Sequence, residues 1–132
     1  MIITLSSTAR DEFIDVTAQV DSTLRELGAD NGLVHLFCRH TTAGLTVNEN
    51  ADPDVRRDML LALRDIVSDD LPYRHAEGNS PAHLRASLMG SALMLPVRGG
   101  RLSLGRWQGV YFCEFGGPRS GRQLELSWFP AE

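Results

Sequence analysis

The side chains best suited to chemistry lie in two short segments of this 132-residue sequence, residues 39–53 and residues 75–83. In the first segment, one apolar run ends at His40 and a second ends at Asn48 and Glu49. The second segment carries two more histidines around a Gly-Asn-Ser sequence. Metal ligands and hydrogen-bonding groups that stand where strand-like residues end are typical of a functional site. The two segments therefore predict one shared site.

Three histidines of these segments form a candidate metal site: His40, His75 and His83. Neutral imidazole is a common metal ligand, and three are enough for a catalytic centre with an open coordination position. A histidine-rich set favours zinc or a similar divalent ion over magnesium, because magnesium prefers carboxylates. Magnesium is the alternative. The competing interpretation is that each histidine is a separate surface or loop-bracing residue. His35 lies inside a strand-like run and is expected to be structural.

An anion site is predicted where residues 78–80 stand before a helix that begins at Ser80-Pro81. Free backbone N–H groups and the helix dipole favour a negative charge there. Arg119 follows a Gly-Gly-Pro turn and is a candidate clamp for a phosphate or carboxylate. The alternatives are a plain helix cap and a solvated surface arginine. The predicted substrate- or anion-binding set is Thr41, Thr42, Asn48, Gly78, Asn79, Ser80 and Arg119.

Two carboxylates and one amide complete the candidate catalytic residues: Glu49, Glu114 and Gln108. Glu49 follows a strand-like run, and Glu114 lies inside one, where a carboxylate needs a partner. Either carboxylate could ligate a metal or act as a general base if it faces the histidines. The alternative for Glu114 is strand alternation that places its side chain in water. Gln108 is a candidate hydrogen-bond partner for a ligand.

Composition excludes several classes of protein. The formal net charge is -4 and no stretch concentrates basic residues, so a nucleic-acid partner is not expected. The apolar runs are too short to span a membrane, and the amino terminus does not resemble a secretory signal. Cys38 and Cys113 lie in apolar surroundings, which favours buried thiols in a reducing cytoplasm over a disulfide. The length fits a single domain over residues 1–132.

The elements that must position these residues alternate between helix and strand patterns. Residues 17–28 predict a helix capped by Thr17 and closed by Gly28, and Asp52-Pro53 opens a second helix. The apolar face of the second helix is Val55, Met59, Leu63, Ile66 and Val67. A short helix follows from Ser80 to Leu88. Strands are predicted at residues 2–5, 12–16 (as the partner of 2–5), 33–38, 45–47, 92–97, 101–104, 109–115 and 123–129. Early helices and late antiparallel strands predict an α+β domain.

Several motifs occur together along the chain and carry a resemblance. They are His40-Thr41-Thr42-Ala43, Asn48-Glu49, Asp58, the segment from His75 to His83, Gly105-Arg106-Trp107-Gln108-Gly109 and Cys113 to Arg119. In this combination the chain closely resembles the YjbQ family, also called the UPF0047 or secondary thiamine-phosphate synthase family. The resemblance covers nearly the whole chain. It implies a β-sandwich-like α+β domain, with two main helices and one short one, that assembles as a homotrimer.

The resemblance also implies a histidine-lined pocket for a metal or an anion, and a weak thiamine-phosphate synthase activity. In that reaction a pyrimidine pyrophosphate is joined to a thiazole phosphate with loss of pyrophosphate. One departure is that Gly116 stands where many relatives have Asp. The leading hypothesis is a cytoplasmic trimeric enzyme that acts on a phosphorylated small molecule. The alternatives are a metal- or metabolite-binding protein without significant turnover and a metal-dependent phosphate-ester hydrolase.

Overall fold

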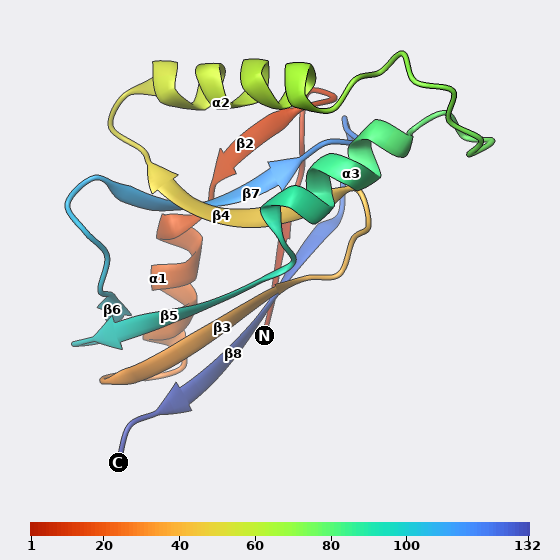
Figure 1. Cartoon of the computed structure of the whole chain (residues 1–132). Helices are drawn as coiled ribbons and strands as arrows, with labels where there is room; N and C mark the ends of the chain where they lie inside the picture. Colours follow the sequence, from red (N-terminus) through yellow and green to blue (C-terminus); the bar gives the residue numbers. More distant parts are fainter.

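Two antiparallel sheets face each other as a sandwich in the computed structural model, which describes residues 1–132 (Figure 1). The strand order is β1-β8-β3-β5-β6 in the first sheet and β2-β7-β4 in the second. The strands are β1 (Ile2–Leu5), β2 (Glu12–Asp15), β3 (Gly32–Cys38), β4 (Ala43–Glu49), β5 (Ala92–Arg98), β6 (Arg101–Leu102), β7 (Gln108–Glu114) and β8 (Arg122–Pro130). The helices are α1 (Thr17–Glu26), α2 (Pro53–Ile66) and α3 (Ser80–Met89). The predicted α+β class is confirmed.

The main hydrophobic core lies between the two sheets, together with the inner face of α1. Strand β7 illustrates why this sandwich forms. Val110 and Phe112 belong to the core between the sheets, whereas Tyr111 and Cys113 belong to a second cluster with α2 and α3. Successive side chains of a strand point to opposite faces, so a strand that is covered on both faces needs an unbroken apolar run. That requirement explains why β7 has the strongest strand pattern in the sequence.

Helix starts agree with the sequence only in part. Asp52 caps α2 as predicted, since its carboxylate accepts the Asp54 N–H at 2.9 Å. Thr17 is not the cap of α1, because Val16 holds that position and the Thr17 hydroxyl instead donates to Asp15 and accepts the Val110 N–H. Likewise the N-cap of α3 is Asn79, one residue before Ser80, and no side chain caps that helix.

Residues 2–5 and 12–16 were predicted to pair with each other, and this prediction is wrong. Strand β1 pairs with β8 in the five-stranded sheet, whereas β2 pairs with β7 in the three-stranded sheet. The intervening residues cross from one sheet to the other instead of forming a hairpin. Ile66 also departs from its predicted place on the buried face of α2, since its side chain is exposed. Strands β5 and β6 form a hairpin whose turn is made by Gly99 and Gly100, both with positive φ.

The position of α3 depends on a glycine in β4. A Cβ atom at Gly44 would lie 2.7 Å from the Gly90 carbonyl oxygen and 2.9 Å from Met89 Cβ. The absence of a side chain therefore lets the end of α3 lie against β4. This contact sets α3 beside the end of the sandwich where the candidate residues gather (Figure 1). None of the three helices is long and apolar enough to cross a membrane.

Candidate functional site

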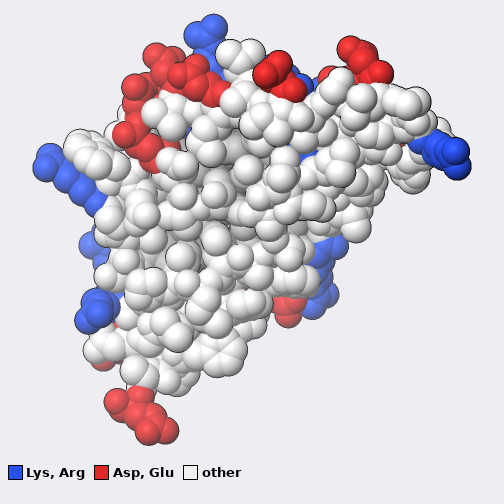
Figure 2. All heavy atoms as spheres, viewed as in Figure 1, with Lys and Arg blue, Asp and Glu red and all other residues white.

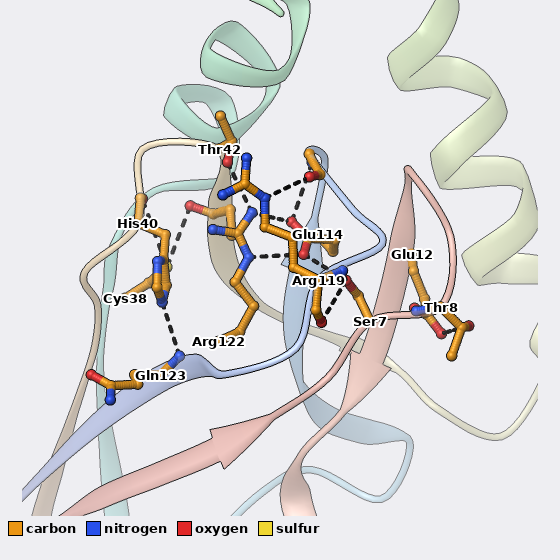
Figure 3. Close-up of polar contacts among 12 residues, drawn as sticks. Ser7, Thr8, Glu12, Cys38, His40, Thr42, Glu114, Arg119, Arg122 and Gln123 are labelled. Atoms are coloured by element: carbon orange, nitrogen blue, oxygen red, sulfur yellow. Dashed lines mark hydrogen bonds and ion pairs between the residues drawn. The ribbon is translucent and has the colours of Figure 1, made fainter.

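The centre of the candidate site is an ion pair between the two sheets. Glu114 ends β7 and Arg122 begins β8, and each side chain points into the space between the sheets, as Phe112 and Leu124 do. Arg122 donates from Nε to Glu114 Oε1 at 2.8 Å and from Nη2 to Glu114 Oε2 (Figure 3). Both residues are almost completely buried. The Glu114 side chain therefore does not point into water, and Arg122 is the partner that a buried carboxylate at this position needs.

Three chain connections pass from one sheet to the other at this end of the sandwich, and each of them contacts the ion pair. Ser7, between β1 and β2, donates its hydroxyl to Glu114 Oε1 at 2.7 Å. Thr42, between β3 and β4, accepts from Arg122 Nη2 at 2.8 Å. The Gly116 N–H, between β7 and β8, donates to Glu114 Oε2 at 3.2 Å. The pair thus fixes three chain connections relative to one another (Figure 3).

These hydrogen bonds decide the charge of Glu114. Burial alone would raise the pKa of this carboxyl group, but the bonds from Arg122, Ser7 and the Gly116 amide outweigh it and lower the pKa. Glu114 is therefore a carboxylate at neutral pH, and all of its strong acceptor positions face donors of the protein. A carboxylate in this state positions its neighbours and is poorly placed to act as a general base.

His40 is held beside the ion pair in one tautomer. Its Nε2 accepts the Gln123 N–H at 2.9 Å, so the neutral ring carries its proton on Nδ1 (Figure 3). Burial lowers the pKa of His40, and the positive charge of Arg122 lowers it further against an opposing effect of Glu114. The ring therefore stays neutral at neutral pH, with a hydrogen-bond donor available on Nδ1.

A cavity of about 430 Å³ lies next to His40. Its lining includes Thr41, His83 and two serines, Ser87 and Ser91. The rings of His75 and His83 also contact each other, with centroids 5.4 Å apart. The structure thus places His83 near each of the other two histidines.

Within one chain the structure shows no metal site formed by all three histidines. No group of three or more His, Cys, Asp or Glu side chains in the structure is arranged to hold a metal ion. His40 could ligate through Nε2 only if it gave up its hydrogen bond to the Gln123 amide. A metal held by the three histidines therefore stays a prediction.

A second cavity, of about 320 Å³, collects three arginines at the amino-terminal end of α3. Arg10 comes from the connection between β1 and β2, Arg85 from α3, and Arg119 from the connection between β7 and β8. Gly78 and Asn79 line the same cavity, together with Gly116 and Gly117. Sequence reasoning placed Gly78, Asn79 and Arg119 in the anion site, and the structure brings these three together.

Two backbone donors at the start of α3 have no acceptor in the structure. They are the N–H groups of Asn79 and Ser80, whereas the Gly78 N–H donates to the His75 carbonyl at 3.0 Å. Gly78 has a φ of 73°, which a residue with a side chain adopts only with strain. The predicted role of the Gly78 amide thus passes to its two neighbours, and Gly78 shapes the turn that presents them.

Three predicted site residues lie at the opposite end of the second sheet. Glu49 of β4 pairs with Gln108 of β7, whereas Glu114 of β7 pairs with Ala43 at the other end of β4. Six residues separate Ala43 from Glu49, which is about 20 Å along a strand. The side chains of Asn48 and Gln108 accept neighbouring backbone N–H groups, those of Glu49 and Gly105. Within one chain the structure does not bring these residues to the two cavities.

Sequence reasoning missed Arg10, Arg85 and Arg122, although two of them left a signal. Arg122 shares the inward face of β8 with Leu124 and Leu126, and strand alternation alone predicts that it is buried. Arg85 lies one turn from Ala82 and next to Ala86, so it shares their buried face. No local pattern marks Arg10, which reaches the cavity through a connection between the sheets.

The thiols take no part in either cavity. Cys38 and Cys113 are both buried and unpaired, as predicted. Burial raises the pKa of both thiols and keeps them protonated at neutral pH. Nucleophilic catalysis by cysteine is therefore not expected here.

This geometry is that of a small α+β sandwich protein with two cavities where the connections between its sheets meet α3. A family model described as "UPF0047 protein YjbQ-like" matches residues 1–130, and the chain belongs to this family. It is 48% identical over 117 residues to the UPF0047 protein YugU of Bacillus subtilis, covering 88% of this chain and 89% of that protein. It is also 44% identical over 124 residues to the UPF0047 protein YjbQ of Salmonella typhimurium, with 89% of each covered.

Solved structures of relatives have the same fold. A crystal structure of a YjbQ/UPF0047 family protein from Clostridium acetobutylicum has a TM-score of 0.92 and 46% sequence identity, with 96% of this chain and 98% of that chain covered. A conserved hypothetical protein from Thermus thermophilus has a TM-score of 0.91 and 41% identity, with 98% and 99% covered. These likenesses establish the fold and the family.

The ion pair between the sheets makes a direct prediction about stability. Replacement of Arg122 by Met leaves the Glu114 carboxylate buried without its main partner, and we expect the free energy of unfolding to fall by about 3–5 kcal/mol. The double variant Arg122→Met with Glu114→Leu removes both charges and should recover much of that loss. Urea unfolding followed by circular dichroism at one protein concentration measures all three proteins. A single variant as stable as the wild type would contradict the assigned role.

His40 makes a prediction about pH. Its pKa in the folded state is lower than the ordinary value of 6.5, so the unfolded chain binds the proton more readily. The stabilisation is complete above pH 6.5 and is lost as the pH falls through the folded pKa. We expect His40→Gln, which keeps an acceptor for the Gln123 N–H without titrating, to flatten the pH dependence of unfolding below pH 6.5. Equal pH slopes for the variant and the wild type would refute this assignment.

Proposed function

We propose that the arginine-lined cavity binds the phosphate groups of a small molecule and that this protein is an enzyme acting on that molecule. The observation that carries the proposal is the meeting of three guanidinium groups with the amino-terminal end of α3. Guanidinium groups pair well with phosphate oxygens, and a helix start adds free N–H groups and a favourable dipole. Two carboxylates, Asp69 and Glu77, also line the cavity, so the cations are in excess.

Arg85 is the strongest single support for an anionic ligand. Its side chain is only 2% exposed, and it is held by hydrogen bonds from Nε and Nη2 to the carbonyl oxygens of Leu63 and Val67. Its Nη1 donates no hydrogen bond within the protein, although the residue lines the cavity. A buried and rigid cation with a free donor is well suited to a phosphate oxygen. Arg119 adds an exposed guanidinium that is anchored through Nε to the Gly116 carbonyl at 3.0 Å.

The reaction that we propose for this cavity is the one that the family resemblance implies. The bond from carbon to the pyrophosphate oxygen of a pyrimidine pyrophosphate breaks, and the nitrogen of a thiazole phosphate forms a new bond to that carbon. Pyrophosphate leaves with the bonding electrons. The nitrogen nucleophile carries its own lone pair, so the step needs charge stabilisation on the leaving group more than it needs a general base. The chain has 13 Arg and no Lys, so a lysine Schiff base is not available.

The apolar outer face of the five-stranded sheet supports assembly with further copies of this chain. Leu33, Phe37, Met94 and Phe129 are large apolar side chains exposed on this face, and no helix covers it. Figure 2, in the same view as Figure 1, shows few charged side chains over its lower part, where β3, β5 and β8 lie. Exposed apolar patches of several hundred square ångströms are typical of protein interfaces. We propose that this face joins the copies of the homotrimer that the resemblance implies.

Binding to pyrophosphate tests the proposed ligand class. We expect Arg119→Gln to weaken pyrophosphate binding about tenfold or more, because each charge-assisted hydrogen bond contributes roughly 1.5–3 kcal/mol. Arg106→Gln is the matched control, since Arg106 is exposed beside Trp107 and lies outside the cavity. Calorimetric titration measures both variants. A wild-type protein without affinity for pyrophosphate at millimolar concentration would contradict the proposal.

A product assay then separates the alternatives. Incubation with a pyrimidine pyrophosphate and a thiazole phosphate should yield thiamine phosphate, detected by mass spectrometry. Release of inorganic phosphate from simple esters would favour a hydrolase instead. Binding without any product would favour a metabolite-binding protein.

Assembly is tested by one substitution on the sheet face. Met94 is 53% exposed there, and Met94→Glu places a charge in the proposed interface. We expect light scattering to give three times the 14.6 kDa chain mass for the wild type and a smaller assembly for this variant. Leu61→Glu on α2, where Leu61 is 63% exposed, is the matched control and should remain trimeric. Disruption by the control but not by Met94→Glu would place the interface elsewhere.

A further inference from the structure

Asp69 lines the arginine-lined cavity, but its contacts are not needed to position the arginines. Its Oδ1 lies 3.3 Å from Arg85 Nη2, and its Oδ2 lies 3.6 Å from Arg10 Nη2. Good charge-assisted hydrogen bonds are about 2.7–2.9 Å long, so both contacts are loose. The Asp69 side chain is 48% exposed, in contrast to the buried Arg85. Both contacts thus join a half-exposed carboxylate to its partner at a long distance, and such ion pairs are weak and are easily exchanged for a better partner.

The two arginines keep their positions through other contacts. Arg85 donates to the Leu63 and Val67 carbonyl oxygens at the end of α2. Arg10 makes a contact of the same length, 3.3 Å, to Asp11, but the Asp11 carboxylate is buried and is itself held by Arg64 of α2 at 3.1 Å. Burial opposes the charge of Arg10, but Asp11 and Asp69 outweigh it and raise the pKa of its guanidinium. Loss of Asp69 would thus leave two charged and positioned guanidinium groups.

Asp69 is also the main polar attachment of the connection between α2 and α3. The other hydrogen bonds of residues 68–78 are local to that segment, such as those from Tyr73 to Ser68 and from Gly78 to His75. The segment has no helix or strand. Only the ion pairs of Asp69 tie its polar groups to Arg10 and Arg85, which belong to other elements. Asp69 is therefore the polar attachment of this connection, beside the ring contact of His75 with His83.

We propose that Asp69 is an internal competitor for the anionic ligand. In the free protein its carboxylate neutralises Arg10 and Arg85, and an incoming phosphate group displaces it and releases the connection between α2 and α3. A phosphate monoester or diphosphate carries more negative charge and more acceptor oxygens than one carboxylate, so it wins the exchange. Weakly charged anions do not, and Asp69 thereby selects for phosphorylated ligands. This inference rests on the proposed phosphate site.

Calorimetric titration with inorganic pyrophosphate compares the wild type with Asp69→Asn and Asp70→Asn. Both variants remove one negative charge from adjacent exposed residues, but only Asp69 pairs with the cavity arginines. We expect Asp69→Asn to bind pyrophosphate about three- to tenfold more tightly than the wild type, as the loss of two weak ion pairs would predict. Asp70→Asn should bind like the wild type.

Hydrogen exchange provides a second readout. Pyrophosphate should speed the exchange of backbone amides in residues 70–76 of the wild type, and Asp69→Asn should show that faster exchange without ligand. Equal affinities of the two variants, or slower exchange on binding, would overturn the inference and leave the phosphate site standing. Absence of binding in all three proteins would instead overturn the proposed function on which the inference rests.

Discussion

The arrangement of this protein depends on the ion pair of Glu114 and Arg122, which lies between the two sheets at one end of the sandwich. A sandwich of two apolar faces has no intrinsic means to fix how its connections cross from one sheet to the other. Here a single carboxylate accepts from Arg122, Ser7 and the Gly116 amide, and Arg122 also donates to Thr42. Buried charges demand such partners. The requirement to satisfy one carboxylate therefore draws three connections to one place.

Both cavities follow from this convergence. The connection between β7 and β8 lies against the one between β1 and β2, where a Cβ atom at Gly117 would lie only 2.6 Å from Ser7 Oγ. This close approach brings Arg10 and Arg119 to the same cavity. On the other side of the ion pair, the Gln123 amide fixes the tautomer of His40. Helix α3 lies along both cavities and contributes Arg85 to one and His83 to the other. One polar centre thus orients an arginine-rich surface and a histidine-bearing surface.

The arginine-rich and histidine-bearing surfaces differ in how many of their polar atoms are free to bind a ligand. A metal site would need the imidazole nitrogens free and close together, whereas Nε2 of His40 is already an acceptor for a backbone amide. The arginines, by contrast, are held by carbonyl oxygens and carboxylates that leave donors free toward the cavity. Binding of an anion would thus require less rearrangement of the side chains than binding of a metal. Chemistry at a phosphorylated ligand would then draw on positive charge that is built into the fold.

The sequence by itself determined the local features, because capping chemistry, glycine turns and apolar periodicity act between neighbouring residues. The α+β class, the cap at Asp52, the hairpin at Gly99-Gly100 and the apolar strand β7 all follow from such short-range patterns. Only the tertiary structure decided that β1 and β2 join different sheets and that Glu49 and Gln108 lie far from Glu114. It also decided which arginines meet at α3. Pairing between strands distant in sequence is set by the packing of the whole core, and no local pattern encodes it.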